Sequence, residues 1–589
     1  MVIKKTTEKT NTVLAERGKT AYTVVLPQEP TEYETFAAGE LCWIFDMAAG
    51  VKPEVVPEND LAAKDRRIFL GYTKALEKLG EKPTFETFSY DGYKIRTEGN
   101  DVYIFGFQRG TYFGVYEFCR IHFGYRYYAK TEIAIEKAES YPLYKTEVFE
   151  KPDIAARSLG FWSTFKFDSE ENVKHTARLK LGRNLYSDWI LSAHTYFLIL
   201  PKEKYFAEHP DWYSPDGMNL CLTNEEMTAQ FIENLKEIIA KTPGHYVMIG
   251  QEDNFGFCEC ERCKALVKET GSPAAVMMRF ANKVAREIGA WLKETDPHRP
   301  LTLVTFAYNA TSTPPVKKDG QGNLVPACDG VVAEDNLAVM VVPFSCVYSK
   351  EYTDKKYNLR TAENFEGWHV VAKNLHVWTY CTNFDNYLIN FNNWGTMKKN
   401  YTILRDLGVS FIFDQGSHNS PTPCFEELRQ FLQSQLLWNL DQSQEELTDE
   451  FFENYYKDIA PHMKHYWELI RSRWDFIEEA LGEGARTGAG DSSCWNLREF
   501  WPKEFLTYCM SVLNDARAKL ELLRAAEWDK YVLLRPRLTK DSLSVRSILL
   551  AVYGNDYGSE LPRKIERFKA DCKASGILVY NEGDFLEIC

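Results

Sequence analysis

The sequence contains no apolar run that approaches the ~20 residues that a helix needs to cross a bilayer. We therefore expect no transmembrane segment. The N-terminal stretch from Met1 to Thr10 has basic residues, but neither an apolar segment nor a small-residue cleavage pattern follows it. These two absences predict a cytoplasmic protein.

An excess of positive charge is also missing. Lys and Arg number 70 against 84 Asp and Glu, which gives a net charge of −14. Such a balance opposes attraction to nucleic acid or to an anionic membrane surface, so we expect neither as a partner. The sequence also lacks a glycine-rich dinucleotide loop, a Walker loop and a Gly-x-Ser-x-Gly motif. Dinucleotide, P-loop and serine-hydrolase chemistry are therefore disfavoured, and we predict no cofactor.

The 14 cysteines are spread along the chain, as in cytosolic proteins where thiols behave as small buried hydrophobic groups. Three of them are closely spaced, at Cys258, Cys260 and Cys263. A zinc site would need a fourth ligand from Cys221, Cys346 or a histidine. No second Cys-x-x-Cys pair is present, and none of the 11 histidines has finger spacing. We therefore predict that the protein binds no metal. The alternative is a metal site with Cys258, Cys260 and Cys263 as ligands.

Three regions follow from length and pattern, because 589 residues exceed a single compact core. Residues 1–145 mix short apolar strands with helical stretches and predict a small α/β domain. Residues 441–589 are almost entirely helical, and we interpret their regularly spaced aromatic residues as helix-packing core. Residues 146–440 alternate between strands and amphipathic helices.

This alternation predicts a central (β/α)8 TIM barrel, with a doubly wound open sheet as the competing architecture. Seven candidate strands are visible, and one more would complete a barrel. They are Ala155–Gly160, Asn184–Trp189, Tyr246–Gly250, Leu301–Ala307, Leu337–Val342, Leu375–Tyr380 and Val409–Phe413.

The most informative segment is the third candidate strand, which ends in two adjacent carboxylates flanked by amides: Gln251, Glu252, Asp253 and Asn254. Catalytic groups of (β/α)8 barrels lie at the C-terminal ends of strands. We therefore predict Glu252 as a general acid. The alternative is an acidic loop that caps the next helix.

Other strand ends carry side chains suited to a sugar. Aromatic residues form 14% of the chain, and such rings stack on sugar faces. Glycoside hydrolysis needs a proton donor and a group that attacks or stabilises the anomeric carbon. For this second role Asp253, Asp385 and Asp414 compete with the substrate's own 2-acetamido group. The remaining candidate sugar contacts are His194, Tyr308, Trp378, Tyr380 and Asn254.

The chain resembles a bacterial family, domain of unknown function 4838, which is associated with glycoside hydrolase family 163. The resemblance covers about residues 100–480. Its first segment is Arg109-Gly-Thr-Tyr-Phe-Gly-Val-Tyr-Glu117, which is similar to the N-terminal domain of α-glucuronidases and family 20 hexosaminidases. The other matching segments are His194-Thr-Tyr-Phe, His209-Pro-Asp-Trp-Tyr213, Leu220-Cys-Leu-Thr-Asn224, Gln251-Glu-Asp-Asn254 with the three cysteines, Ala307-Tyr308 with Pro314-Pro315, Trp378-x-Tyr380 and Leu436-Leu-Trp438.

The resemblance implies a retaining endo-β-N-acetylglucosaminidase that acts on N-glycan cores with help from the substrate acetamide. Glu252 would then be the acid/base and Asp253 would orient the acetamide. Many members have Asn-Asp at this pair, which makes Asp253 the alternative for the more general functional residue. Two rivals remain: an exo-glycosidase for uronic acids, whose carboxylate would need an arginine such as Arg157, and a catalytically silent carbohydrate-binding barrel.

Overall fold

The computed structural model describes residues 2–60, 66–165, 169–182, 188–482, 489 and 494–583. The chain divides into two compact units. The first comprises Met1–Ala155, Phe167–Gly182 and Phe425–Lys464, and the second comprises Ala156–Lys166, Arg183–Cys424 and His465–Cys589. The division into three consecutive domains stays a prediction.

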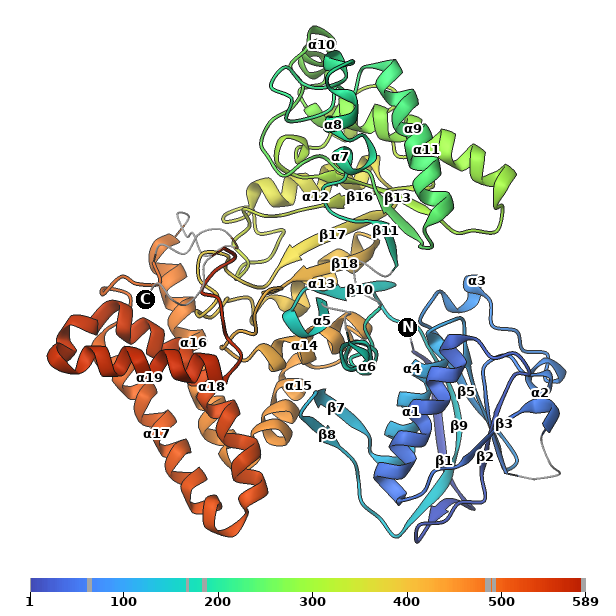
Figure 1. The fold of residues 1–589 in the computed structure, drawn as a ribbon, viewed down its shortest axis with the longest axis vertical. Coiled ribbons are helices and arrows are strands. Elements are labelled where there is room, and N and C mark those ends of the chain that lie inside the picture. The colour runs from blue at the N-terminus through green and yellow to red at the C-terminus, as the bar shows by residue number, and fades with distance from the viewer. Residues whose placement is uncertain are drawn as a thin grey trace. The chain divides into compact units, whose positions relative to one another are not determined.

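The first unit is built on a seven-stranded mixed sheet with the order β1-β9-β5-β6-β4-β2-β3. Strands β1, β9, β5 and β6 pair antiparallel, and β6, β4, β2 and β3 pair parallel. Helices α1 (Glu32–Ala49) and α4 (Gly110–Phe123) pack together on one face of this sheet (Figure 1). The strands are β1 (Val2–Glu16), β2 (Thr23–Leu26), β3 (Glu54–Pro57), β4 (Arg67–Leu70), β5 (Tyr93–Glu98), β6 (Asp101–Gly106) and β9 (Ser140–Glu150).

Later segments of the chain return to this unit. A hairpin of β7 (Arg126–Ala129) and β8 (Glu132–Ala134) meets helices α14 (Glu426–Trp438) and α15 (Gln444–Phe451). The guanidinium of Arg126 lies 2.6 Å from a carboxylate oxygen of Glu450, and the Tyr128 hydroxyl donates to the same carboxylate at 2.8 Å. Residues more than 300 positions apart in the chain therefore share one core.

The second unit contains a curled, entirely parallel seven-stranded sheet with the order β10-β18-β17-β16-β13-β12-β11. This is the chain order of a barrel, with the first strand beside the last. The strands are β10 (Ala156–Leu159), β11 (Trp189–Leu191), β12 (Tyr246–Met248), β13 (Thr302–Ala307), β16 (Leu337–Val341), β17 (Leu375–Tyr380) and β18 (Val409–Gln415).

The α/β class and the parallel sheet are confirmed, whereas closure into an eight-stranded barrel is not. Within the described ranges no pairing joins β10 to β11. Six predicted strands lie at β10, β12, β13, β16, β17 and β18, and the predicted strand Asn184–Trp189 falls mainly on residues outside the described part. The described architecture is a curled half-barrel.

Aromatic side chains fill the concave side of the sheet. Trp189, Tyr246, His376 and Phe411 come from four different strands, and their rings lie within 5.1–6.3 Å of one another. Successive side chains of a strand point to opposite faces. This packing therefore identifies which residues of each strand face inward.

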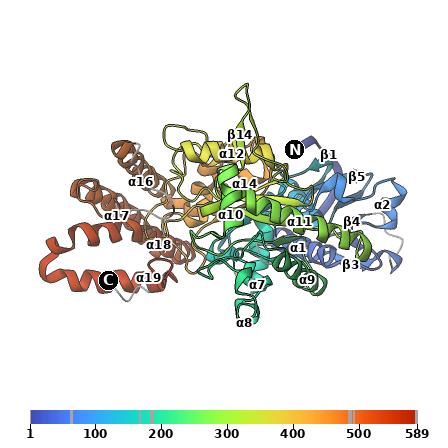
Figure 2. The ribbon, with the colours of Figure 1, turned by 90° about the horizontal axis from the view of Figure 1, so that it is seen from above.

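Helices cover the other side of the sheet and form the C-terminal region. The covering helices include α11 (Pro273–Thr295), α12 (Leu359–Val371) and α13 (Met397–Asp406), and α9 (Glu225–Lys241) packs against α11. The helical C-terminal region is confirmed, with α16 (Ala460–Leu481), α17 (Lys503–Ala526), α18 (Trp528–Tyr553) and α19 (Leu561–Ala574). Figures 1 and 2 show α17, α18 and α19 side by side. Among the described residues no helix combines the length and apolarity that a membrane crossing requires.

Candidate functional site

The C-terminal end of β12 is joined tightly to the loop after β11. The Thr195 hydroxyl donates to the Met248 carbonyl at 2.8 Å and accepts the Gly250 N–H at 3.0 Å. A Cβ on Gly250 would lie 2.7 Å from the Ala193 carbonyl oxygen and 2.8 Å from the Phe306 ring. Only glycine permits this approach, so the strand end is held in one position.

Asp253 is the carboxylate that this strand end presents to solvent. Its side chain is 65% exposed, and the Tyr308 hydroxyl donates to its Oδ1 at 3.1 Å. His194 Nδ1 lies 2.6 Å from the Gln251 carbonyl oxygen. A carbonyl can only accept, so Nδ1 carries a proton and Nε2 faces Asp253 Oδ2 at 4.0 Å. Asp253 thus lies between a tyrosine and a histidine.

Glu252 faces different partners. Its Oε1 accepts the Phe197 N–H at 2.9 Å, at the start of the short helix α7 (Tyr196–Ile199). Burial, and then the charge of Glu252, raise the pKa of Tyr196. The two adjacent carboxylates therefore have separate surroundings, and only Asp253 is joined to Tyr308.

The flanking amides hold loops together. Gln251 is buried; its Nε2 donates to the Tyr308 carbonyl at 2.8 Å, and its Oε1 accepts the Thr311 hydroxyl at 2.8 Å. Asn254 Oδ1 accepts from Asn219 Nδ2 at 2.9 Å. Asn254, which the sequence predicts as a sugar contact, is thus engaged in loop structure.

An aromatic floor lies beside this group. Trp378 is half-buried, its ring packs on Phe306 and Phe413, and its Nε1 donates to Gln415 Oε1 at 2.8 Å. Tyr380 is buried. Burial raises the pKa of its hydroxyl strongly, and the charges of Tyr308, Asp253 and Glu582 raise it further.

Burial also raises the pKa of Tyr308 to about 12, followed by the effect of Asp253. A tyrosine with a raised pKa keeps its proton at neutral pH and remains a hydrogen-bond donor. The geometry therefore combines a carboxylate, a protonated tyrosine and an indole face, which together can bind a sugar and orient a polar substituent.

Asp414 does not lie in this group, contrary to the prediction. It is 2% exposed and accepts a hydrogen bond from Tyr401 on the covering helix α13. The reason is strand alternation: Phe413 and Gln415 face the concave side, so Asp414 faces the helices. Gln415 takes the inward position and pairs in register with Tyr380.

Arg157 also lies outside this group, and strand alternation is again the reason. It is 1% exposed and pairs in register with Ile412, whereas its neighbour Ser158 pairs with the inward-facing Phe413. The arginine therefore lies on the helix-covered face. The uronic acid alternative loses the cation that was to bind the substrate carboxylate.

Asp385 is exposed in the loop after β17, where its N–H donates to Asn383 Oδ1 at 2.9 Å. Its role as a sugar contact stays a prediction.

Glu582 is the residue that the sequence analysis misses. Its N–H donates to the Phe384 carbonyl at 3.4 Å, and its own carbonyl accepts from Asn419 Nδ2 at 3.1 Å. The charge of its side chain raises the pKa of Tyr308 and of Tyr380. A C-terminal residue therefore brings a further carboxylate toward the strand ends. No local pattern signals this, because the return of the segment is a tertiary contact.

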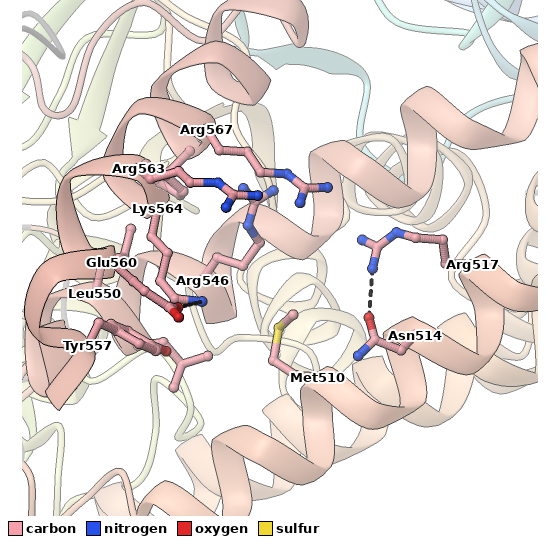
Figure 3. Close-up of a pocket in the computed structure, with 12 residues that line it drawn as sticks. Met510, Asn514, Arg517, Arg546, Leu550, Tyr557, Glu560, Arg563, Lys564 and Arg567 are labelled. Atoms are coloured by element: carbon pink, nitrogen blue, oxygen red, sulfur yellow. Dashed lines mark hydrogen bonds and ion pairs between the residues drawn. The ribbon is translucent and has the colours of Figure 1, made fainter.

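A separate hollow of about 360 Å³ lies among α17, α18 and α19 (Figure 3). Figure 3 shows Arg517, Arg546, Arg563 and Arg567 directed into it from these three helices. Burial, and then the charges of Arg567 and Arg546, lower the pKa of Arg517. Five of its twelve lining residues are cationic and none is a strand-end carboxylate, so we assign the candidate site to the strand ends.

Comparisons with solved structures show the same fold in glycoside hydrolases. A family GH115 4-O-methyl-alpha-glucuronidase, BtGH115A, with specificity for decorated arabinogalactans, matches with a TM-score of 0.58 and 12% identity, over 96% of this chain and 77% of that chain. A family 89 glycoside hydrolase from Clostridium perfringens, in complex with PUGNAc, matches with a TM-score of 0.50 and 11% identity, over 92% of this chain and 65% of that chain. At these identities the likeness establishes the fold alone.

Among curated proteins no match to this sequence is found. A family model, described as domain of unknown function DUF4838, matches residues 127–468. This match spans more than half of the 589 residues and includes β10 to β18 with all of their strand-end loops. The chain therefore belongs to the DUF4838 family.

Proposed function

We propose that this protein is a retaining glycoside hydrolase for N-acetylhexosamine-containing glycans. The observation that carries the proposal is the Asp253 carboxylate, which is held by Tyr308 and faces His194 at the C-terminal end of a parallel strand. This is the edge where enzymes with parallel α/β sheets place their catalytic groups. The glycosidase folds of the structural neighbours agree with it.

The roles follow from the chemistry of the neighbouring groups. Asp253 accepts the N–H of the substrate acetamide, and the acetamide oxygen attacks the anomeric carbon while the glycosidic oxygen leaves. Tyr308, which keeps its proton, donates to the oxygens of Asp253 or of the sugar. Trp378 supplies the face on which the sugar ring stacks.

Protonation of the leaving oxygen needs a second carboxyl group. We propose Glu252 for this role, and Glu582 is the alternative that the structure adds. Because a proton donor matters less when the leaving group is already a weak base, activated aryl glycosides separate the two carboxylate roles.

The test compares the wild type with Asp253→Asn, Glu252→Gln and Glu582→Gln on a glycan panel and on an aryl N-acetylglucosaminide. Mass spectrometry identifies the products. We expect Asp253→Asn to lose about 100-fold or more on every substrate. Glu252→Gln should lose as much on glycans but retain most activity on the aryl glycoside.

Three other outcomes would change the roles proposed for these residues. Full activity in Asp253→Asn would remove the proposed acetamide role. A loss confined to Glu582→Gln would transfer the proton-donor role to the C-terminal segment. Binding of glycans without cleavage, unchanged in all variants, would indicate a silent carbohydrate-binding protein.

A further inference from the structure

Four cysteine sulfurs from two loops converge beside the strand ends. Cys221 follows the short helix at Pro210–Trp212, and Cys258, Cys260 and Cys263 come from the loop after β12 and the first turn of α10 (Glu261–Thr270). The four sulfurs lie within 4.8 Å of one another, and those of Cys221 and Cys260 are 3.6 Å apart. We propose that these four thiolates bind a structural zinc ion.

The spacing matches the chemistry of zinc. Tetrahedral zinc with bonds of about 2.3 Å places its sulfur ligands about 3.8 Å apart. The Cys221–Cys260 separation is close to this value, and the 4.8 Å limit for the whole set leaves only a small contraction around an ion. An all-sulfur set favours a soft metal over calcium or magnesium.

The local backbone supports thiolate ligands. Cys260 is the N-cap of α10, and its sulfur accepts the Cys263 N–H at 3.5 Å. The Thr223 hydroxyl lies 3.3 Å from the Cys263 sulfur and 3.7 Å from the Cys260 sulfur. These donors can stabilise negative sulfur in the way that outer partners support metal ligands.

The four thiols are available to a metal and can be reached from solvent. All four thiols are free, three are buried and Cys260 is half-buried. A hollow of about 500 Å³ borders Cys221 and Cys260, so an ion has a path to the sulfurs. Four protein ligands complete a tetrahedron and leave no position for substrate, which makes the site structural.

The zinc would join two loops at the candidate site. The loop with Cys258 begins at Asp253 and Asn254, and Asn254 already binds Asn219 two residues before Cys221. The ion would thus hold the loop that begins at Asp253 against the segment that carries Asn219 and Cys221. The metal site itself stands whether or not the protein cleaves glycosides.

The first test measures metal in the full chain purified under reducing conditions. We expect about one zinc ion per chain by elemental mass spectrometry. After removal of zinc with a chelator, Co²⁺ should restore binding and give the intense near-ultraviolet thiolate-to-cobalt absorption of a tetrahedral sulfur site. Zinc removal should also lower Tm by several degrees.

Variants then locate the ion. Cys221→Ser and Cys260→Ser should each lower zinc content at least fivefold, whereas Cys328→Ser, which removes a half-buried thiol outside the cluster, should leave it unchanged. The Co²⁺ titration of the wild type needs no variant, so poor folding of a serine variant does not prevent the test.

Three results would overturn the proposal. One is reduced wild-type protein that neither contains zinc nor binds Co²⁺. Another is the finding that the four cysteines form two disulfides in the natively folded protein. The third is iron in place of zinc. Metal content is independent of turnover, so failure of this proposal is distinguishable from failure of the glycosidase proposal.

Discussion

At the residue scale, two tyrosine–aspartate hydrogen bonds have opposite positions on the same sheet. Tyr308 donates to Asp253, whose side chain is 65% exposed at the strand ends. Tyr401 donates to Asp414, which is 2% exposed under the covering helix. The chemical pair is the same, and only its surroundings differ. We therefore expect one pair to serve function and the other to serve stability.

The variant Tyr308→Phe should lower kcat/KM by about tenfold to 100-fold, because a hydrogen bond to a charged group contributes about 1.5–3 kcal/mol. Its free energy of unfolding should change little, since water can replace the lost donor at an exposed carboxylate. Steady-state kinetics and urea unfolding measure the two effects.

The matched variant Tyr401→Phe should show the reverse pattern. It leaves a buried carboxylate without its tyrosine donor and should cost about 1–3 kcal/mol of unfolding free energy, with kcat nearly unchanged in the folded fraction. Equal kinetic losses in both variants would contradict the assignment of Asp253 to the site and of Asp414 to the core.

At the element scale, the end of β12 depends on a close backbone approach. Gly250 has ordinary backbone torsion, so its requirement is steric: a Cβ would meet the Ala193 carbonyl oxygen at 2.7 Å and the Met248 side chain at 2.9 Å. Neither neighbour is the free end of a flexible surface chain. The strand end that carries Asp253 therefore has almost no freedom to shift.

We expect Gly250→Ala to lower the free energy of unfolding by about 1–3 kcal/mol through overpacking, and to lower activity as the strand end moves. The control is Gly39→Ala in helix α1, where nothing lies within 4 Å of the added Cβ. That variant should gain about 0.5–1 kcal/mol from helix propensity. Urea unfolding of both variants checks the signs, and a neutral Gly250→Ala would disprove the close approach.

At the scale of the whole molecule, three buried histidines make the fold sensitive to acid. Burial lowers the pKa of His122 from 6.5 to about 4, and it lowers the pKa values of His175 and His376 to about 3. The first two belong to the first compact unit and His376 to the second. Both units therefore contain imidazoles that resist protonation while folded.

The free energy of unfolding falls as the pH falls, because the unfolded chain binds more protons than the folded chain. Below pH 6.5 the unfolded chain protonates these residues and the folded chain does not, so their stability contribution is complete above pH 6.5 and is lost as pH falls toward the folded pKa values. Three protons correspond to about 4 kcal/mol per pH unit at the steepest point. Urea unfolding between pH 7 and pH 4.5 should show this loss.

The variant His376→Phe isolates one proton, since its ring lies among Trp189, Tyr246 and Phe411 and a phenyl ring suits that environment. We expect the variant to lose about 1.4 kcal/mol per pH unit less than the wild type in this window. Identical slopes for the two proteins would rule out a neutral buried His376.

The sequence by itself determined the parallel strands, the helical C-terminal region and the polar strand ends. Apolar periodicity is local, and strand ends follow from where that periodicity stops. It also determined the three clustered cysteines, because their spacing is written within six residues of chain from Cys258 to Cys263. The candidate carboxylate pair Glu252–Asp253 was visible for the same reason.

Only the tertiary structure decided which of these groups meet. The curl of the sheet determined that Gln415 faces inward and that Asp414 and Arg157 face the helices, since alternation alone does not say which side is concave. Long-range packing brought Cys221 to the other thiols and Glu582 to Tyr308 and Tyr380. Contacts between distant segments depend on the free energy of the whole fold, which no local pattern contains.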